Sequence, residues 1–271
     1  MKQWKRSIKI EFGEMYSEAG RLPVLTINPM FSAEKHILIL GSEFGDRDFC
    51  ADSVLDIARK FMGNFRPFYT KITMVPVIDT YGHPGKCGLV SSEGFESPSY
   101  LSDGKPSKEI PSDVMDLLSI VRQEKYNLVL QATSIVHEKW PFCDGYFVVP
   151  SVSVVAEGEK TLFSIKPETK DIAGTVLAAV KKHVSLQSLH TNGVVGNRYA
   201  VAREGILLPA SVSNDSVEVH TRNIVSLACL ENQTECITLV ASSSIKADNI
   251  ASRKAHSAAL EAVIRMYEKN I

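Results

Sequence analysis

A cluster of charged side chains directly after a short apolar run is the part of this chain best suited to chemistry. Glu43, Asp46 and Arg47 follow the apolar residues 37–40. A guanidinium at such a place can receive a carboxylate or a phosphate through paired hydrogen bonds. The alternative is structural, since acidic residues at a helix N-terminus interact favourably with the helix dipole. The pattern therefore predicts either a small polar pocket for an anion or an acidic helix start without a ligand.

Two further groups of polar residues accompany other apolar runs and are candidates for the same site. Asp79 and His83 follow a second run, and Thr133 and His137 follow a third. Because the carboxyl ends of parallel strands meet at one edge of a sheet, we expect these side chains to converge with the charged cluster. A metal site built from the two histidines and a carboxylate is an alternative that no local ligand spacing indicates. Cys87, which follows a lysine, is an alternative nucleophile, since a neighbouring ammonium lowers the pKa of a thiol.

The elements that must position these residues can be predicted from hydrophobic periodicity. Alternation and short apolar runs predict strands at 7–12, 22–27, 36–40, 72–78, 127–132, 146–149, 152–156, 161–165, 198–202, 217–219, 224–229 and 236–241. Apolar residues at helical spacing predict helices at about 50–62, 111–124, 169–184 and 248–268. Residues 20–21 and 192–196 are expected to form turns, and 79–111 a long loop. Lysines near the first strand are typical of an exposed edge strand.

The order of these elements predicts the fold class. Strands that alternate with helices indicate an α/β fold with a mixed, mainly parallel, twisted sheet and helices on both faces. The chain contains no internal repeat and no low-complexity segment. Residues 1–271 are therefore expected to form a single domain.

Composition narrows the classes of partner and compartment. Lys and Arg number 30 against 31 Asp and Glu, so the charge gives no reason to expect nucleic acid as a partner. No apolar run approaches the ~20 residues that a membrane-spanning helix needs, and the charged N-terminus does not resemble a signal peptide. The five cysteines include no C-x-x-C pair. We expect a cytoplasmic protein with reduced thiols and no membrane association.

The ordered elements resemble those of the zinc carboxypeptidase superfamily, including its succinylglutamate desuccinylase and aspartoacylase branch. Four stretches carry the similarity. Residues 16–27 resemble that family's opening turn and strand, and residues 36–48 its strand and zinc loop. Residues 74–83 resemble its Val-Pro-x-x-Asn-Pro-Asp-Gly strand end, and residues 127–134 the strand that supplies its third zinc ligand. The resemblance covers most of the chain in order and implies a carboxypeptidase-like fold.

The same resemblance aligns the family's zinc ligands and general base with residues of this chain that cannot fill these roles. The positions of the three zinc ligands fall on Phe44, Arg47 and Thr133, and the position of the general base falls on Val240. A phenyl ring has no donor atom for zinc, and a guanidinium at a ligand position repels a divalent cation. We therefore expect no metal at these positions and predict no cofactor.

Two functional hypotheses follow, and whether the chain is an enzyme stays open between them. The first is a carboxypeptidase-fold protein that has lost zinc-dependent hydrolysis and binds a small anionic ligand or a partner. The alternative is an active metal-dependent amide hydrolase, a carboxypeptidase or amino-acid deacylase, whose zinc site has moved to residues such as His83 and His137. The partner is left open between a small molecule, a peptide and a protein, including a second copy of this chain.

Overall fold

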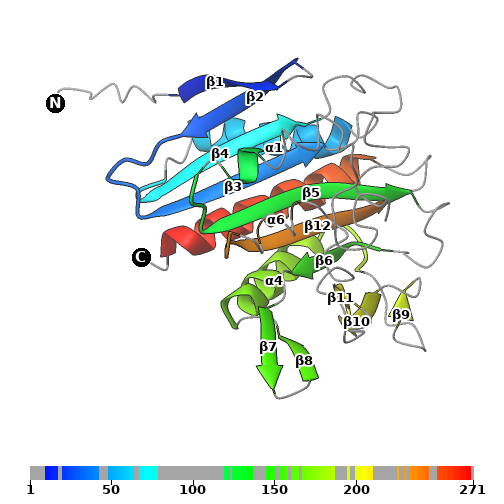
Figure 1. Cartoon of the computed structure of the whole chain (residues 1–271). Coiled ribbons are helices and arrows are strands. Elements are labelled where there is room, and N and C mark those ends of the chain that lie inside the picture. The colour runs from blue at the N-terminus through cyan, green and yellow to red at the C-terminus, as the bar shows by residue number, and fades with distance from the viewer. Residues whose placement is uncertain are drawn as a thin grey trace.

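The computed structural model describes most of the chain between residues 10 and 269 (Figure 1). The described residues are 10–17, 20–42, 48–63, 67–78, 119–122, 124–136, 145–150, 153–157, 160–164, 167–186, 194–195, 199–209, 225, 229, 232–243 and 249–269. The predicted loop at 79–111, most of the predicted helix at 111–124 and the predicted strand at 217–219 lie outside them.

Twelve strands are described, and ten of them form one sheet. They are β1 (Ile10–Ser17), β2 (Gly20–Ile27), β3 (Lys35–Ser42), β4 (Thr70–Val77), β5 (Leu128–Val136), β6 (Phe147–Pro150), β7 (Ser153–Glu157), β8 (Lys160–Ser164), β9 (Val194–Val195), β10 (Tyr199–Arg203), β11 (Ile206–Pro209) and β12 (Glu235–Ser243). The sheet order is β1-β2-β4-β3-β5-β12-β6-β11-β10-β9, and β7 and β8 form a separate hairpin.

The centre of the sheet is parallel and its outer parts are largely antiparallel (Figure 1). β3 pairs in parallel with β4 and with β5, and β5 pairs in parallel with β12. β1 and β2 extend one side as antiparallel strands, and β1 is the edge strand that the sequence predicts. The other side continues through β6, which is antiparallel to β12 and parallel to β11. The predicted mixed α/β sheet is confirmed.

Three long helices cover one face of this sheet. They are α1 (Asp48–Gly63), α4 (Pro167–Val180) and α6 (Asn249–Lys269). α1 joins β3 to β4 and packs on both, while α6 lies between α1 and α4 and reaches β12. The apolar stripe of α1, including Val54, Ile57 and Phe61, is buried in the core beneath the helices because its spacing follows the helical period.

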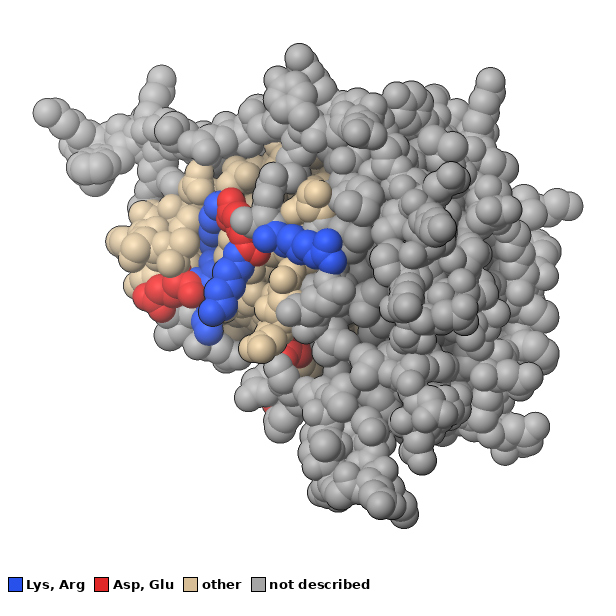
Figure 2. All heavy atoms as spheres, viewed as in Figure 1, with Lys and Arg blue, Asp and Glu red and all other residues tan. Residues whose placement is uncertain are grey.

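A second apolar layer lies on the opposite face. Ile120 and Val121, from the helical residues 119–122, pack there with Val225, Cys229 and side chains of the central strands. The expectation of helices on both faces is therefore confirmed. In the view of Figure 2, the described surface carries basic and acidic side chains beside one another rather than in separate patches.

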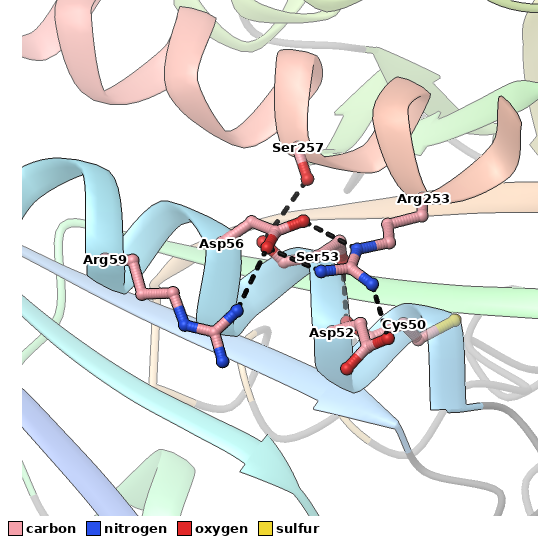
Figure 3. Close-up of polar contacts among 7 residues, drawn as sticks. All are labelled: Cys50, Asp52, Ser53, Asp56, Arg59, Arg253 and Ser257. Atoms are coloured by element: carbon pink, nitrogen blue, oxygen red, sulfur yellow. Dashed lines mark hydrogen bonds and ion pairs between the residues drawn. The ribbon is translucent and has the colours of Figure 1, made fainter. Parts of the chain in front are cut away.

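An ion-pair network joins α1 to α6 (Figure 3). Nε and Nη2 of Arg253, on α6, donate to the two carboxylate oxygens of Asp56 at 2.6 Å each, and Nη1 donates to Asp52 at 2.7 Å. Arg59 approaches the same Asp56 carboxylate at 3.6 Å. These contacts fix the register between the two helices, one of which begins after β3 and the other after β12.

Two predicted local features are wrong. Gly20 and Arg21 do not form a turn but belong to β2, where they lie opposite Ser17 and Tyr16. Continued backbone pairing outweighs the turn preference of the glycine. In the segment 224–229, which the apolar pattern predicts as a strand, Val225 and Cys229 are helical. Short apolar runs do not distinguish a strand from a buried helical turn.

The remaining differences concern boundaries and one strand that the sequence did not predict. α4 ends at Val180, several residues before its predicted end. Residues 194–195 form β9 and pair with β10, so the predicted hairpin exists but does not turn at these residues. β11 was not predicted; Gly205, at φ +73°, makes the turn that leads into it. Among the described helices, none is long and apolar enough to cross a membrane.

Candidate functional site

The carboxyl ends of the four parallel strands lie along one edge of the sheet. Here β3 and β5 separate: their pairing ends at Leu40 and Gln131. β3 continues beside β4 as far as Ser42, whereas β5 continues beside β12 as far as Val136. The strand order also reverses between β3 and β5, which is where open α/β sheets bind ligands. This edge is therefore the candidate functional site.

Thr133 and Val240 lie together at this edge. They are opposite each other in the parallel pairing of β5 and β12. Side chains alternate along a strand, so both point to the face that carries Val129 and Cys236 rather than to the face covered by α1, α4 and α6. Their exposed fractions are only 7% and 4%. The hydroxyl-bearing side chain of Thr133 and the isopropyl group of Val240 therefore lie side by side at this edge, and both are buried.

Gly41 sets the path of β3 into the site. A Cβ at this position would lie 2.2 Å from the carbonyl oxygen of Pro76 on β4. Only glycine permits this approach of two backbones. Pro76 is tolerated because it lies beyond Met74, where the pairing of β4 with β2 ends. Gly41 and Pro76 together let the backbones of β3 and β4 approach closely near the carboxyl ends of the two strands.

A buried polar cluster supports the same edge from the helix layer. His256 on α6 places Nε2 at 3.1 Å from the carbonyl oxygen of Thr133 and Nδ1 at 2.9 Å from the hydroxyl of Tyr146. Sγ of Cys50, on α1, lies 3.9 Å from Nε2, and the ring of Phe49 stacks on the imidazole at 5.9 Å. The cluster joins α1, α6, β5 and the residue that precedes β6.

The imidazole of His256 and the phenol of Tyr146 are neutral at physiological pH. Burial lowers the pKa of His256 to about 4, although the carbonyl of Thr133 favours the protonated form. Burial also raises the pKa of Tyr146 well above its usual value. A neutral imidazole that faces a carbonyl through Nε2 must carry its proton there, so Nδ1 accepts the hydrogen bond from Tyr146.

A second polar cluster lies at the amino end of the central strands. His36 places Nε2 at 2.9 Å from Oγ1 of Thr73 and Nδ1 at 3.0 Å from Glu124. Nζ of Lys71 binds the same carboxylate at 2.9 Å. Burial, followed by the Lys71 ammonium, lowers the pKa of His36 to about 4, against the opposing effect of Glu124. Because the hydroxyl and the imidazole are almost fully buried, this arrangement binds β3 to β4 rather than presenting a nucleophile.

One of the residues that the sequence nominated for the site lies within the described part of the chain. Thr133 is described and lies at the expected edge. The other candidates lie outside the described residues: Glu43, Phe44, Asp46, Arg47, Asp79, His83 and His137. The strands that precede them, β3, β4 and β5, end at the candidate edge. Sequence reasoning did not single out His256, because a histidine in an alanine-rich helix gives no signal of its own.

No family model and no curated protein sequence matches the chain. Solved structures do. A candidate metallopeptidase from Shewanella amazonensis superposes with a TM-score of 0.62 at 14% identity, over 96% of this chain and 86% of that one. A metallo-carboxypeptidase from Burkholderia cenocepacia superposes with a TM-score of 0.60 at 11% identity, over 97% of this chain and 65% of its own. The chain has a carboxypeptidase-like fold.

A further metallo-carboxypeptidase, from Pseudomonas aeruginosa, was solved with (2-guanidinoethylmercapto)succinic acid. It superposes with a TM-score of 0.56 at 10% identity over 97% of this chain. This chain spans 66% of that protein and 65% of the Burkholderia carboxypeptidase. At such identities the similarity establishes the carboxypeptidase-like fold, and the activity must be argued from the site itself.

The described residues do not fit the zinc that a carboxypeptidase-like fold implies. Zinc in proteins is held by cysteine, histidine, aspartate or glutamate, and the hydroxyl of Thr133 is none of these. Val240, beside it, has no group that could accept a proton from water. Within the described part of the chain, no three side chains of the ligating types are grouped as a metal site would need.

Proposed function

We propose that this carboxypeptidase-fold protein no longer hydrolyses its ligand with zinc and instead binds a small anionic molecule at the carboxyl edge of β3 and β5. The observation that carries the proposal is the register of Thr133 with Val240. The resemblance to carboxypeptidases aligns these two positions with a zinc ligand and the general base. Their adjacency on neighbouring strands supports that alignment, and their side chains lack the chemistry of both roles.

The anionic character of the ligand rests on Arg47. This residue follows β3 in the sequence and aligns with a position where a zinc ligand would stand. A guanidinium there would take over the positive charge that the zinc ion supplies in a carboxypeptidase, and it binds carboxylates directly through paired hydrogen bonds. The Pseudomonas carboxypeptidase was solved with a substituted succinic acid. A dicarboxylic acid of that kind is therefore a reasonable first probe for this chain.

Isothermal titration calorimetry with metal-free protein tests the proposal. We expect (2-guanidinoethylmercapto)succinic acid to bind without added metal, and Arg47→Gln to weaken the binding roughly tenfold or more. Arg253→Gln is the matched control, because this arginine lies in the helix layer and pairs with Asp56 and Asp52. Equal weakening by both variants would contradict the assignment of Arg47, and absence of binding to the wild-type protein would contradict the proposed function.

The alternative, an active amide hydrolase, is separated from the proposal by a second assay. It requires metal-dependent release of an amino acid from peptides or N-acylated amino acids, and loss of that release in the variants His83→Ala and His137→Ala. We expect no release with or without added zinc. A metal-dependent rate that either substitution abolishes would overturn the proposed function.

A further inference from the structure

His256 occupies an unusual place for a polar side chain. Its exposed fraction is 0%, as is that of Cys50, and Tyr146 is 2% exposed. Yet both ring nitrogens of His256 have hydrogen-bond partners, one on each side of the ring. A buried imidazole costs free energy unless both nitrogens are satisfied. The arrangement therefore fixes the ring in one orientation and one tautomer.

The bond to Thr133 falls where the sheet gives β5 less support. Pairing of β5 with β3 stops at Gln131, while pairing with β12 continues to Val136. From Thr133 onward β5 thus has one described strand neighbour instead of two. The Nε2–H of His256 donates a hydrogen bond to the backbone carbonyl of Thr133. The helix layer thus binds β5 within the part of the strand that has only one described strand neighbour.

The orientation of the ring is set from three sides. The hydroxyl of Tyr146 holds Nδ1, the ring of Phe49 stacks on one face, and Sγ of Cys50 lies against Nε2. Because these residues come from different elements, the position of the Nε2–H does not depend on α6 alone. A donor held in this way can keep a carbonyl in place as the strands on either side separate.

We propose that His256 is a positioning residue for the edge site: its Nε2–H holds the carbonyl of Thr133 and thereby fixes how β5 leaves the sheet beside the gap between β3 and β5. The inference rests on the proposed function in placing the ligand at that gap. It goes further because it assigns the path of β5 at this gap to His256, a residue on α6 that the sequence did not connect with the site.

Two substitutions separate the two ring nitrogens. The side-chain amide of His256→Gln reaches the position of Nε2 and can still donate to Thr133. His256→Asn reaches only the position of Nδ1, so it keeps a partner for Tyr146 and loses the donor to Thr133. Both remove the ring from its stack on Phe49, so the two variants share this packing loss and differ in which hydrogen bond they keep, the one to Thr133 in His256→Gln or the one to Tyr146 in His256→Asn.

Two measurements are made on the full chain: amide hydrogen exchange of residues 134–136 by mass spectrometry, and affinity for (2-guanidinoethylmercapto)succinic acid. We expect His256→Asn to speed exchange at 134–136 and weaken binding roughly tenfold, and His256→Gln to stay within about threefold of wild type in both. Arg253→Gln, which loosens α6 one turn earlier, should leave exchange at 134–136 unchanged. If His256→Asn does not fold, Tyr146→Phe is the milder variant and should speed the same exchange by a smaller factor.

The outcomes distinguish this inference from the proposed function. Equal exchange at 134–136 in the Asn and Gln variants would show that His256 only fills space and would overturn the inference. Unchanged affinity in His256→Asn, with binding intact in the wild type, would also overturn it. If the wild-type protein does not bind the probe, the proposed function fails, and the exchange comparison still decides whether His256 positions β5.

Discussion

Val240 lies directly opposite Thr133 in the parallel pairing of β5 and β12. A carboxypeptidase-like site would need a proton acceptor and a metal ligand near this place, and the chain offers an alkyl group and a hydroxyl, both nearly buried. Under the proposed function, the carboxypeptidase-like fold keeps its strand arrangement at this edge, while the two positions that the resemblance aligns with a zinc ligand and the general base carry side chains without that reactivity.

The close approach of Gly41 to Pro76 predicts a strong effect of a single methyl group. In Gly41→Ala the new Cβ would lie 2.2 Å from the carbonyl oxygen of Pro76, which is backbone and cannot rotate away. We expect the free energy of unfolding to fall by roughly 3 kcal/mol or more, because β3 and β4 must separate. Urea denaturation followed by circular dichroism measures the change. A variant with the wild-type midpoint would show that the two strands are further apart than described.

The two buried histidines predict a loss of stability in mild acid. His36 and His256 have pKa values of about 4 in the folded protein and about 6.5 when unfolded. Between these values the unfolded chain binds more protons, so stability falls as pH falls from about 6.5 to about 4, by about 3 kcal/mol at most for each histidine. Urea denaturation at a series of pH values tests this. His256→Gln should reduce the slope in that window, and an unchanged slope would contradict the assignment.

The ion pair formed by Arg253 and Asp56 is expected to contribute modestly to the free energy of unfolding. Its two parallel hydrogen bonds hold the pKa of Asp56 below its usual value, but a third of each side chain is exposed to solvent. A double-mutant cycle with Arg253→Gln and Asp56→Asn should give a coupling energy of about 0.5–1 kcal/mol, smaller at high salt. A coupling of several kcal/mol, or none, would contradict this geometry.

Two buried hydroxyls predict stabilising substitutions. Oγ of Ser134 and Oγ1 of Thr70 are buried without a hydrogen-bond partner in the described structure. Removing an unpaired polar atom avoids its desolvation cost, so Ser134→Ala and Thr70→Val should each raise the free energy of unfolding by about 1 kcal/mol. Thermal denaturation compares the stabilities of the two variants. Thr70→Val serves as the reference, because Thr70 lies at the opposite end of the strands from the candidate site. If only Thr70→Val stabilises, the hydroxyl of Ser134 has a partner that the described residues do not include.

Sequence periodicity located the central strands and long helices because these elements have strong, sustained patterns. The run 36–40 became β3, and the helical spacing of Val54, Ala58 and Phe61 marked α1. Predictions failed where few residues carried the signal, as at Gly20 and in the segment 224–229. There, pairing and burial by distant parts of the chain decide the local structure.

The site could be predicted less completely than the fold. The edge was found from strand order, since carboxyl ends of parallel strands must meet. The contribution of His256 could not be found, because Thr133 and His256 are 123 residues apart and their contact depends on how α6 packs against α1 and β12. The alanine-rich pattern of α6 predicts a buried stripe and does not reveal that its histidine lies within it.

Zinc content tests the central claim most directly. The protein is purified without chelators, dialysed against buffer that contains zinc at low micromolar concentration, and analysed for metal by mass spectrometry. We expect far less than one zinc per chain, and no change in zinc content in Thr133→Ala. One zinc per chain that Thr133→Ala or Arg47→Ala removes would contradict the account, because it would assign the metal to positions that the proposed function treats as metal-free.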